Sequence, residues 1–167
     1  MISAETILAL EAVAKKQGSG IDHETLNGVW TLQNTWTEAG VRPTPGTDFL
    51  LRGLGARLEL NNSTNGWRIV NQIMAAGVQL RFEGEAQLKG RRPMLMFRFE
   101  TVKLSLSGRI LLKRNLPEPS TRRMPFFALI AMADNGEWLA ARGRGGGLAL
   151  WMRGKQPVGE VQDQARS

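Results

Sequence analysis

Few side chains in this sequence could act as a nucleophile or a general base. The 167 residues include no cysteine, no tyrosine and one histidine, His23. Without cysteine there is no thiolate nucleophile, no disulfide framework and no cysteine-ligated zinc or iron–sulfur site. A Ser-His-Asp triad would have to be built on His23, and a lone histidine in a polar stretch is usually solvated. We therefore interpret His23 as a solvated residue.

The carboxylates do not suggest a catalytic pair. Glu83 and Glu85 would share one face of a strand, beside Arg81, which favours a row of surface ion pairs over an acid–base couple. Asp134 belongs to a turn motif. One histidine with scattered carboxylates does not supply three or four converging metal ligands. The sequence therefore predicts a protein that is not an enzyme and holds no metal or cofactor.

A glycine-rich stretch, Gly143 to Gly147, follows Arg142 and includes Arg144. Arginine–glycine segments bind RNA as repeats in disordered chains, whereas this one occurs once, between two apolar runs. The pattern favours a hairpin whose glycines allow positive φ and close strand approach. No phosphate-loop motif fits the sequence, because the glycine and lysine at 154–155 lack both the earlier glycine and the following Ser or Thr.

The positive charge is concentrated in one segment. The chain has a formal net charge of +7, and residues 81–123, with eleven basic and four acidic side chains, account for all of it. Such a segment can be a solvated strand face, can hold the protein at an anionic membrane at about 1 kcal/mol per basic residue, or can bind nucleic acid. We favour nucleic acid least. The expected membrane-facing residues are Arg91, Arg92, Lys113, Arg114, Arg122 and Arg123.

Helical periodicity is confined to the N-terminus, where apolar residues recur every three or four positions between the capping residue Ser3 and Gly18. From Leu26 onward, apolar and polar residues alternate, which is the period of half-buried strands. We expect eight or nine strands, with long loops at 40–49 and 114–125. The expected strands are 30–36, 58–60, 67–73, 78–83, 95–99, 102–106, 126–132, 138–142 and 148–152.

An antiparallel sheet of this size after one helix is typical of a small closed barrel. The predicted organisation is a helix and linker at 1–20, the barrel at 21–154 and a polar, disordered tail at 155–167. The sequence has no secretory signal, no transit segment and no apolar run of membrane-spanning length. We therefore expect a cytoplasmic protein that lies peripherally at a membrane.

Three blocks of the sequence resemble a known family. They are Leu-Asn-Gly-Val-Trp-Thr-Leu at 26–32, Trp-Arg-Ile-Val-Asn at 67–71, and the closing element from Trp138 through Arg142-Gly143 to Trp151. In this order they resemble the plastid lipid-associated proteins, also called fibrillins or plastoglobulins, over about residues 26–153. Two positions depart from the family pattern: Ala-Asp-Asn at 133–135 replaces the usual Tyr-Leu-Asp, and Leu139 replaces an arginine.

This resemblance implies a lipocalin-like (calycin) barrel of a cyanobacterial type. Members bind small lipophilic molecules, such as carotenoids, quinones or fatty-acyl lipids, at thylakoid membranes or lipid bodies, and have photoprotective or structural roles. The expected partners are accordingly a lipophilic small molecule and an anionic membrane surface, and the oligomeric state is left open. A barrel mouth rich in Trp, Phe and Met suits a long apolar ligand.

We expect six residues to line the cavity or close the barrel end: Trp30, Asn71, Phe97, Phe99, Trp138 and Arg142. Arg142 shares strand parity with Trp138, so if both face inward Arg142 could meet a ligand carboxylate or carbonyl. The alternative is that Arg142 stacks on Trp30 and closes the barrel end.

Two other functions remain open at this point. A barrel-type tetrapyrrole (bilin) lyase or chaperone would need a general base, for which the sequence offers His23, Asp134 or the glutamates. A nucleic-acid adaptor would use the basic segment, and its affinity would fall steeply with salt.

Overall fold

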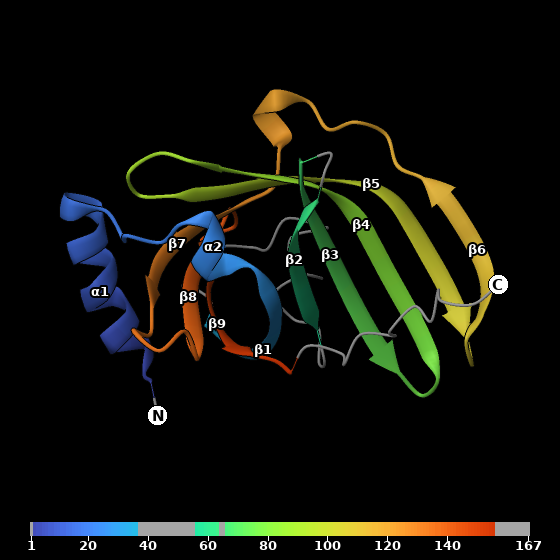
Figure 1. Ribbon diagram of the computed structural model, residues 1–167, viewed down its shortest axis with the longest axis horizontal. Coiled ribbons are helices and arrows are strands. Elements are labelled where there is room, and N and C mark those ends of the chain that lie inside the picture. Colours follow the sequence, from blue (N-terminus) through green and yellow to red (C-terminus); the bar gives the residue numbers. More distant parts are fainter. Residues whose placement is uncertain (1, 37–55, 64–65, 156–167) are drawn as a thin grey trace, which may run out of the picture.

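The computed structural model of the protein describes residues 2–36, 56–63 and 66–155, and it is mostly β (Figure 1). The expected loop at 40–49 and most of the expected tail lie outside these residues. The helical elements are α1 (Ala4–Gln17), the single turn α2 (His23–Leu26) and the 3-10 turn η1 (Thr121–Arg123). The strands are β1 (Gly28–Trp36), β2 (Arg57–Ser63), β3 (Gly66–Ala75), β4 (Val78–Lys89), β5 (Met94–Leu106), β6 (Arg109–Asn115), β7 (Phe126–Met132), β8 (Trp138–Gly143) and β9 (Leu148–Arg153).

The nine strands form one antiparallel sheet that closes on itself. Their order is β4-β3-β2-β1-β9-β8-β7-β5-β6, and β4 also pairs with β5, so eight strands form a ring and β6 lies outside it on β5. The pairs β1–β9 (Thr31 with Met152) and β5–β7 (Leu95 with Phe127) complete the ring. The expected antiparallel sheet with an N-terminal helix is confirmed.

The N-terminal helix begins and ends where the sequence predicts. Ser3 Oγ accepts a hydrogen bond from the Thr6 amide at 3.2 Å, and the helix ends at Gly18 with φ +84°. A Cβ at Gly18 would lie 2.5 Å from the carbonyl oxygen of Arg91 in the β4–β5 turn. The glycine therefore allows the end of α1 to approach this turn closely.

Strands β7, β8 and β9 are apolar on both faces because they separate two cores. Their inner side chains, including Leu129 and Leu139, pack inside the ring, and their outer ones, including Ile130 and Leu150, pack under α1 around Ile7. A strand that is buried on both faces has apolar residues at consecutive positions, so its sequence is a continuous apolar run. Figure 1 shows α1 lying beside β7 and β8 at one end of the molecule.

The expected strands at 95–99 and 102–106 form one strand, β5. Its inward positions change from Leu95, Phe97 and Phe99 to Val102 and Leu104, because the register shifts where Glu83 and Gly84 meet β5. A bulge of this kind lets one strand continue through a bend. A Cβ at Gly84 would lie 1.7 Å from the carbonyl oxygen of Arg98, so this approach requires glycine.

Strand β6 lies mostly in residues 107–113, to which the sequence analysis assigned no strand, and its end overlaps the expected loop at 114–125. Apolar and polar residues do not alternate at Ile110, Leu111 and Leu112, because the register of the β5–β6 pair shifts between Ile110 and Leu112. Beyond the bulge opposite Glu83 and Gly84, the end of β3, the start of β4 and the end of β5 extend past the ring. Together with β6 they form a sheet that projects from the ring, called the projecting sheet below (Figure 1). Neither helix within the described ranges is long and apolar enough to cross a membrane.

Candidate functional site

The inside of the ring holds four of the six expected cavity residues. Trp30 and Phe97 belong to the large inner core and are almost fully buried, and Phe99 packs against that core. Asn71 lies on the same face, since it follows the core residue Ile69 by two positions on β3. The buried side chains of this core reach α2 at Leu26, and Phe99 lies in the part of the ring nearer the projecting sheet.

A row of aromatic rings leads from the core to that part. Trp151 and Phe127 lie 6.2 Å apart, Phe127 and Phe97 5.3 Å, Phe97 and Phe99 5.3 Å, and Phe99 and Phe82 5.3 Å, all between ring centroids. Trp151, Phe127 and Phe97 are buried, whereas Phe99 and Phe82 are partly exposed. The exposure of the rings therefore increases along the row, from the packed core to a partly exposed apolar face.

Asn71 is a buried polar residue on this inner face. The side chain is 1 % exposed, and its Oδ1 is buried without a hydrogen-bond partner among the described residues. Its cross-strand neighbours are Leu58 and Phe82, which lie on the same face of the sheet. Leaving a buried polar atom unpaired costs about 1–3 kcal/mol. Such an atom is a candidate for binding a polar group that enters the ring.

The end of the ring is closed by Arg153 and not by Arg142. The guanidinium of Arg153 lies 4.3 Å from the Trp30 ring centroid and donates to the backbone carbonyls of Thr25, Asn27 and Gly136. Trp30 in turn donates from Nε1 to Leu26 O at 2.9 Å. The expected stacking of Arg142 on Trp30 is wrong, because β9 pairs with β1 and brings Arg153 opposite Trp30.

Trp138 and Arg142 do share a face of β8, as expected, but it is the outer face. Trp138 packs in the outer core under α1. Arg142 donates from Nε to Glu11 Oε1 at 2.8 Å and from Nη2 to Glu11 Oε2 at 2.6 Å. The orientation of both residues into the ring is therefore wrong, since the apolar faces of β8 gave no indication of which one α1 covers.

Glu11 is the centre of a charged cluster that the sequence analysis missed. Besides Arg142, it accepts from Arg92 Nη2 at 2.7 Å and lies 3.8 Å from Lys15 Nζ, although it is only 2 % exposed. The hydrogen bonds from Arg142 hold the pKa of Glu11 below its ordinary value. The position of Glu11 between Ile7 and Ala14 on the buried stripe of the helix is the signal that could have revealed it.

The expected row of ion pairs on β4 and β5 is confirmed. Glu83 lies 2.6 Å from Arg81 Nε and 3.0 Å from Lys103 Nζ, and Glu85 lies 2.8 Å from Arg98 Nη2. Burial is the largest single effect on the pKa of Glu83 and raises it, but the hydrogen bonds and charges of Arg81 and Lys103 together outweigh burial, so this pKa lies below its ordinary value. These carboxylates form ion pairs on the surface of the sheet, and they neutralise part of the positive charge of residues 81–123.

The six expected membrane-facing residues do not lie together. Arg91 and Arg92 follow Lys89 at the β4–β5 turn beside α1, whereas Lys113 and Arg114 are on β6 at the opposite end of the molecule (Figure 1). Lys113 is level with Arg81 through Lys103, so at about 3.3 Å per strand residue the eight steps of β4 from Arg81 to Lys89 separate the two groups by roughly 26 Å. Arg122 and Arg123 lie on η1. Arg92 also contacts Glu11 of α1, so its guanidinium takes part in a contact inside the fold.

The remaining candidates for chemistry are dispersed. His23 is exposed and lies 4.8 Å from the Trp67 ring, and Asp134 is exposed in the β7–β8 turn. The glycine-rich stretch forms the expected hairpin, with Gly143 N donating to Gly147 O at 2.9 Å. Within the described ranges no three potential metal-ligating side chains lie together.

A scan against protein-family models finds no match, and neither does a search of curated proteins.

Proposed function

We propose that this protein binds a small lipophilic molecule inside the ring, with the polar end of the molecule at Asn71. Carotenoids, quinones and fatty-acyl lipids have the required shape, a long apolar body with one polar end. The observation that carries this proposal is the buried, unpartnered Oδ1 of Asn71 on an otherwise apolar face. The amide offers a donor and an acceptor, so it suits a hydroxyl or a carbonyl group.

The apolar body would extend from Asn71 along the partly exposed inner positions of β4 and β5, beside Phe82 and Phe99. Burial of apolar surface there contributes roughly 25 cal/mol per Å² before ordering costs. The closed ring and the Arg153–Trp30 contact support a lipocalin-like barrel of the plastid lipid-associated type. A photoprotective or structural role without catalysis belongs to the same proposal.

Titration with retinol and retinal, followed by tryptophan quenching, tests the inner site. Replacing Asn71 by Leu (Asn71→Leu) keeps the volume but removes both hydrogen-bonding atoms, and we expect affinity for either probe to fall by about threefold to tenfold. The unliganded variant should be at least as stable as the wild type, because an unpaired buried atom is lost. Asn61→Leu makes the same change at an exposed position of β2 and should leave both affinities unchanged. Unchanged affinity in Asn71→Leu would refute the proposal.

The projecting sheet would hold the protein at an anionic membrane. Its tip carries large apolar side chains that are each at least 40 % exposed, namely Met74, Val78, Leu106, Ile110, Leu111 and Leu112. The β3–β4 and β5–β6 turns lie side by side there, since Ser107 N donates to Gly77 O at 2.9 Å. Arg109, Lys113 and Arg114 on β6 are exposed as well. Apolar side chains beside cations suit a lipid headgroup layer.

Co-sedimentation with vesicles containing phosphatidylglycerol tests this orientation. Lys113→Glu reverses one charge on β6 of the projecting sheet and should weaken vesicle binding roughly tenfold or more, since each charge near the surface contributes about 1 kcal/mol. Lys89→Glu makes the same change at the opposite end of β4 and should have little effect. Equal losses in the two variants would show that binding follows net charge and not this surface.

A further inference from the structure

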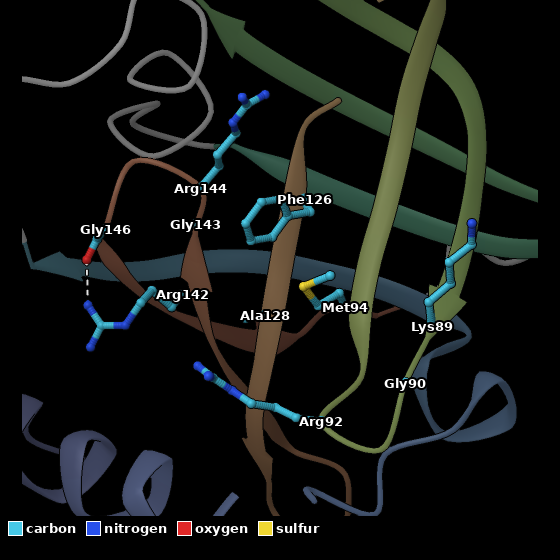
Figure 2. A pocket seen from close by; sticks show the side chains of 10 residues that line it. All are labelled: Lys89, Gly90, Arg92, Met94, Phe126, Ala128, Arg142, Gly143, Arg144 and Gly146. Carbon is cyan, nitrogen blue, oxygen red and sulfur yellow. Dashed lines mark hydrogen bonds between the residues drawn. The ribbon is translucent and has the colours of Figure 1, made fainter. Parts of the chain in front are cut away.

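A cavity lies on the outer face of the ring, away from Asn71. It has a volume of about 580 Å³ and lies between the β4–β5 turn and the β8–β9 hairpin (Figure 2). Its floor is apolar and is formed mainly by Met94 and Phe126. These side chains point outward, because their neighbours along the chain, Leu95 and Phe127, pack in the inner core. The cavity is therefore separate from the proposed lipophile site.

Four cationic side chains surround this apolar floor: Lys89, Arg92, Arg142 and Arg144. Figure 2 shows Phe126 and Met94 in the middle of the view with the four cations around them. Among the described residues that line the cavity there is no carboxylate. Glu11 contacts Arg92 and Arg142, so these five residues together keep an excess of three positive charges.

Several of the donors are not satisfied by carboxylates. Arg92 Nε is buried without a hydrogen-bond partner, and Lys89 is exposed and makes no ion pair with a described residue. Arg144 donates to the backbone carbonyls of Arg122 and Met124. The β8–β9 hairpin is held in place by the bond from Arg142 Nη1 to Gly146 O at 2.6 Å. The cations are thus positioned by the fold, and among the described residues the carboxylate that contacts them is that of Glu11, on Arg92 and Arg142.

We propose that this outer cavity binds a long-chain carboxylate, with the carboxylate among the cations and the first part of the chain on Met94 and Phe126. Guanidinium groups match the two oxygens of a carboxylate. The apolar floor distinguishes the cavity from a site for a small inorganic anion, and its volume lies within the range of small-molecule sites. Glu11 acts as a positioning residue here, because it orients Arg92 and Arg142 from behind.

Calorimetric titration of the full chain with decanoate, below its micelle concentration, tests the proposal. Decanol is the neutral counterpart, and inorganic phosphate is the anion without a chain. Because the proposed inner site would also accept decanol or decanoate, the comparison uses the binding component that Lys89→Glu weakens. For that component we expect decanoate to bind at least about tenfold more tightly than either, because the outer cavity provides both charge and apolar surface. Equal binding of decanol, or equal competition by phosphate, would overturn the assignment of the ligand class. No binding of decanoate would overturn the site itself.

Charge-reversal variants locate the binding on the protein. Lys89→Glu should weaken decanoate binding about tenfold, whereas Lys113→Glu, the same change on β6, should alter it less than about twofold. Asn71→Leu should also leave it unchanged, so the outer cavity and the inner site can fail separately. Wild-type affinity in Lys89→Glu, or loss of decanoate binding in Asn71→Leu, would overturn the placement in the outer cavity. Thermal unfolding of each variant checks that the fold is retained.

Discussion

Replacement of Glu11 by Gln should undock the N-terminal helix from the ring. Glu11→Gln keeps the shape of the side chain but removes the charge that Arg92 and Arg142 face at 2.7 and 2.6 Å. Removing one partner of a buried ion pair costs about 3–5 kcal/mol. Because the arginine side chains retain 30 % and 17 % of their exposure, water relieves part of this cost, and we expect about 3 kcal/mol.

Urea unfolding measures this loss. A change of about 3 kcal/mol moves the midpoint by roughly 1–2 M when the slope is typical of a small domain. Hydrogen exchange should accelerate first in α1 and the outer face of β8. Glu5→Gln is the matched control, since Glu5 is exposed in the first turn of the same helix and only its interaction with the helix dipole is lost, below about 1 kcal/mol. If the two variants are equally stable, the reasoning on this cluster is wrong.

The same cluster predicts a pH dependence. The pKa of Glu11 is lower in the folded chain than its ordinary value of 4.5, mainly because Arg142 donates to the carboxylate. The stabilisation is therefore complete above the unfolded pKa and is lost as the pH falls through the folded pKa. The free energy of unfolding of the wild type should fall more steeply below pH 4.5 than that of Glu11→Gln. Parallel pH profiles would contradict the assignment.

Three further variants test other contacts. Gly84→Ala would place a Cβ 1.7 Å from Arg98 O at the β4–β5 bulge, and we expect it to destabilise the fold by about 3 kcal/mol in urea unfolding. Arg153→Gln removes the cation over Trp30 and bonds to three carbonyls, for a loss of about 1–2 kcal/mol with a changed tryptophan emission. Leu111→Asp at the exposed tip should weaken vesicle sedimentation without changing the unfolding midpoint.

Local patterns in the sequence predicted most of the elements. Ser3 and Gly18 mark the ends of α1 because caps depend on a few neighbouring residues. Alternation located most strands, and a row of ion pairs at Glu83 and Glu85 followed from their spacing on one strand beside Arg81. Strand β6 was missed because its register shift at 110–112 removes the alternation. Such a bulge depends on the partner strand, which a local pattern does not contain.

The site residues were predicted less well, because their roles depend on ring closure. Arg142 was correctly predicted to share a face of β8 with Trp138. Which of the two faces points into the ring, however, depends on where α1 packs. Arg153 meets Trp30 only because β9 pairs with β1, over a hundred residues apart in sequence. In the helix, the apolar Val13 is exposed, whereas Glu11 is buried against arginines from distant parts of the chain. These are non-local contacts, and one sequence shows only the residue types.

The most direct test of the inner site observes the Asn71 amide itself. In nitrogen-labelled protein, the side-chain amide signal of Asn71 is identified by its absence in Asn71→Leu. We predict that retinol shifts this signal strongly, while the Asn27 amide, whose Oδ1 already accepts from Trp67 Nε1 at 2.7 Å, stays in place. Saturable retinol binding that leaves the Asn71 signal unmoved would place the ligand elsewhere and contradict the proposed function.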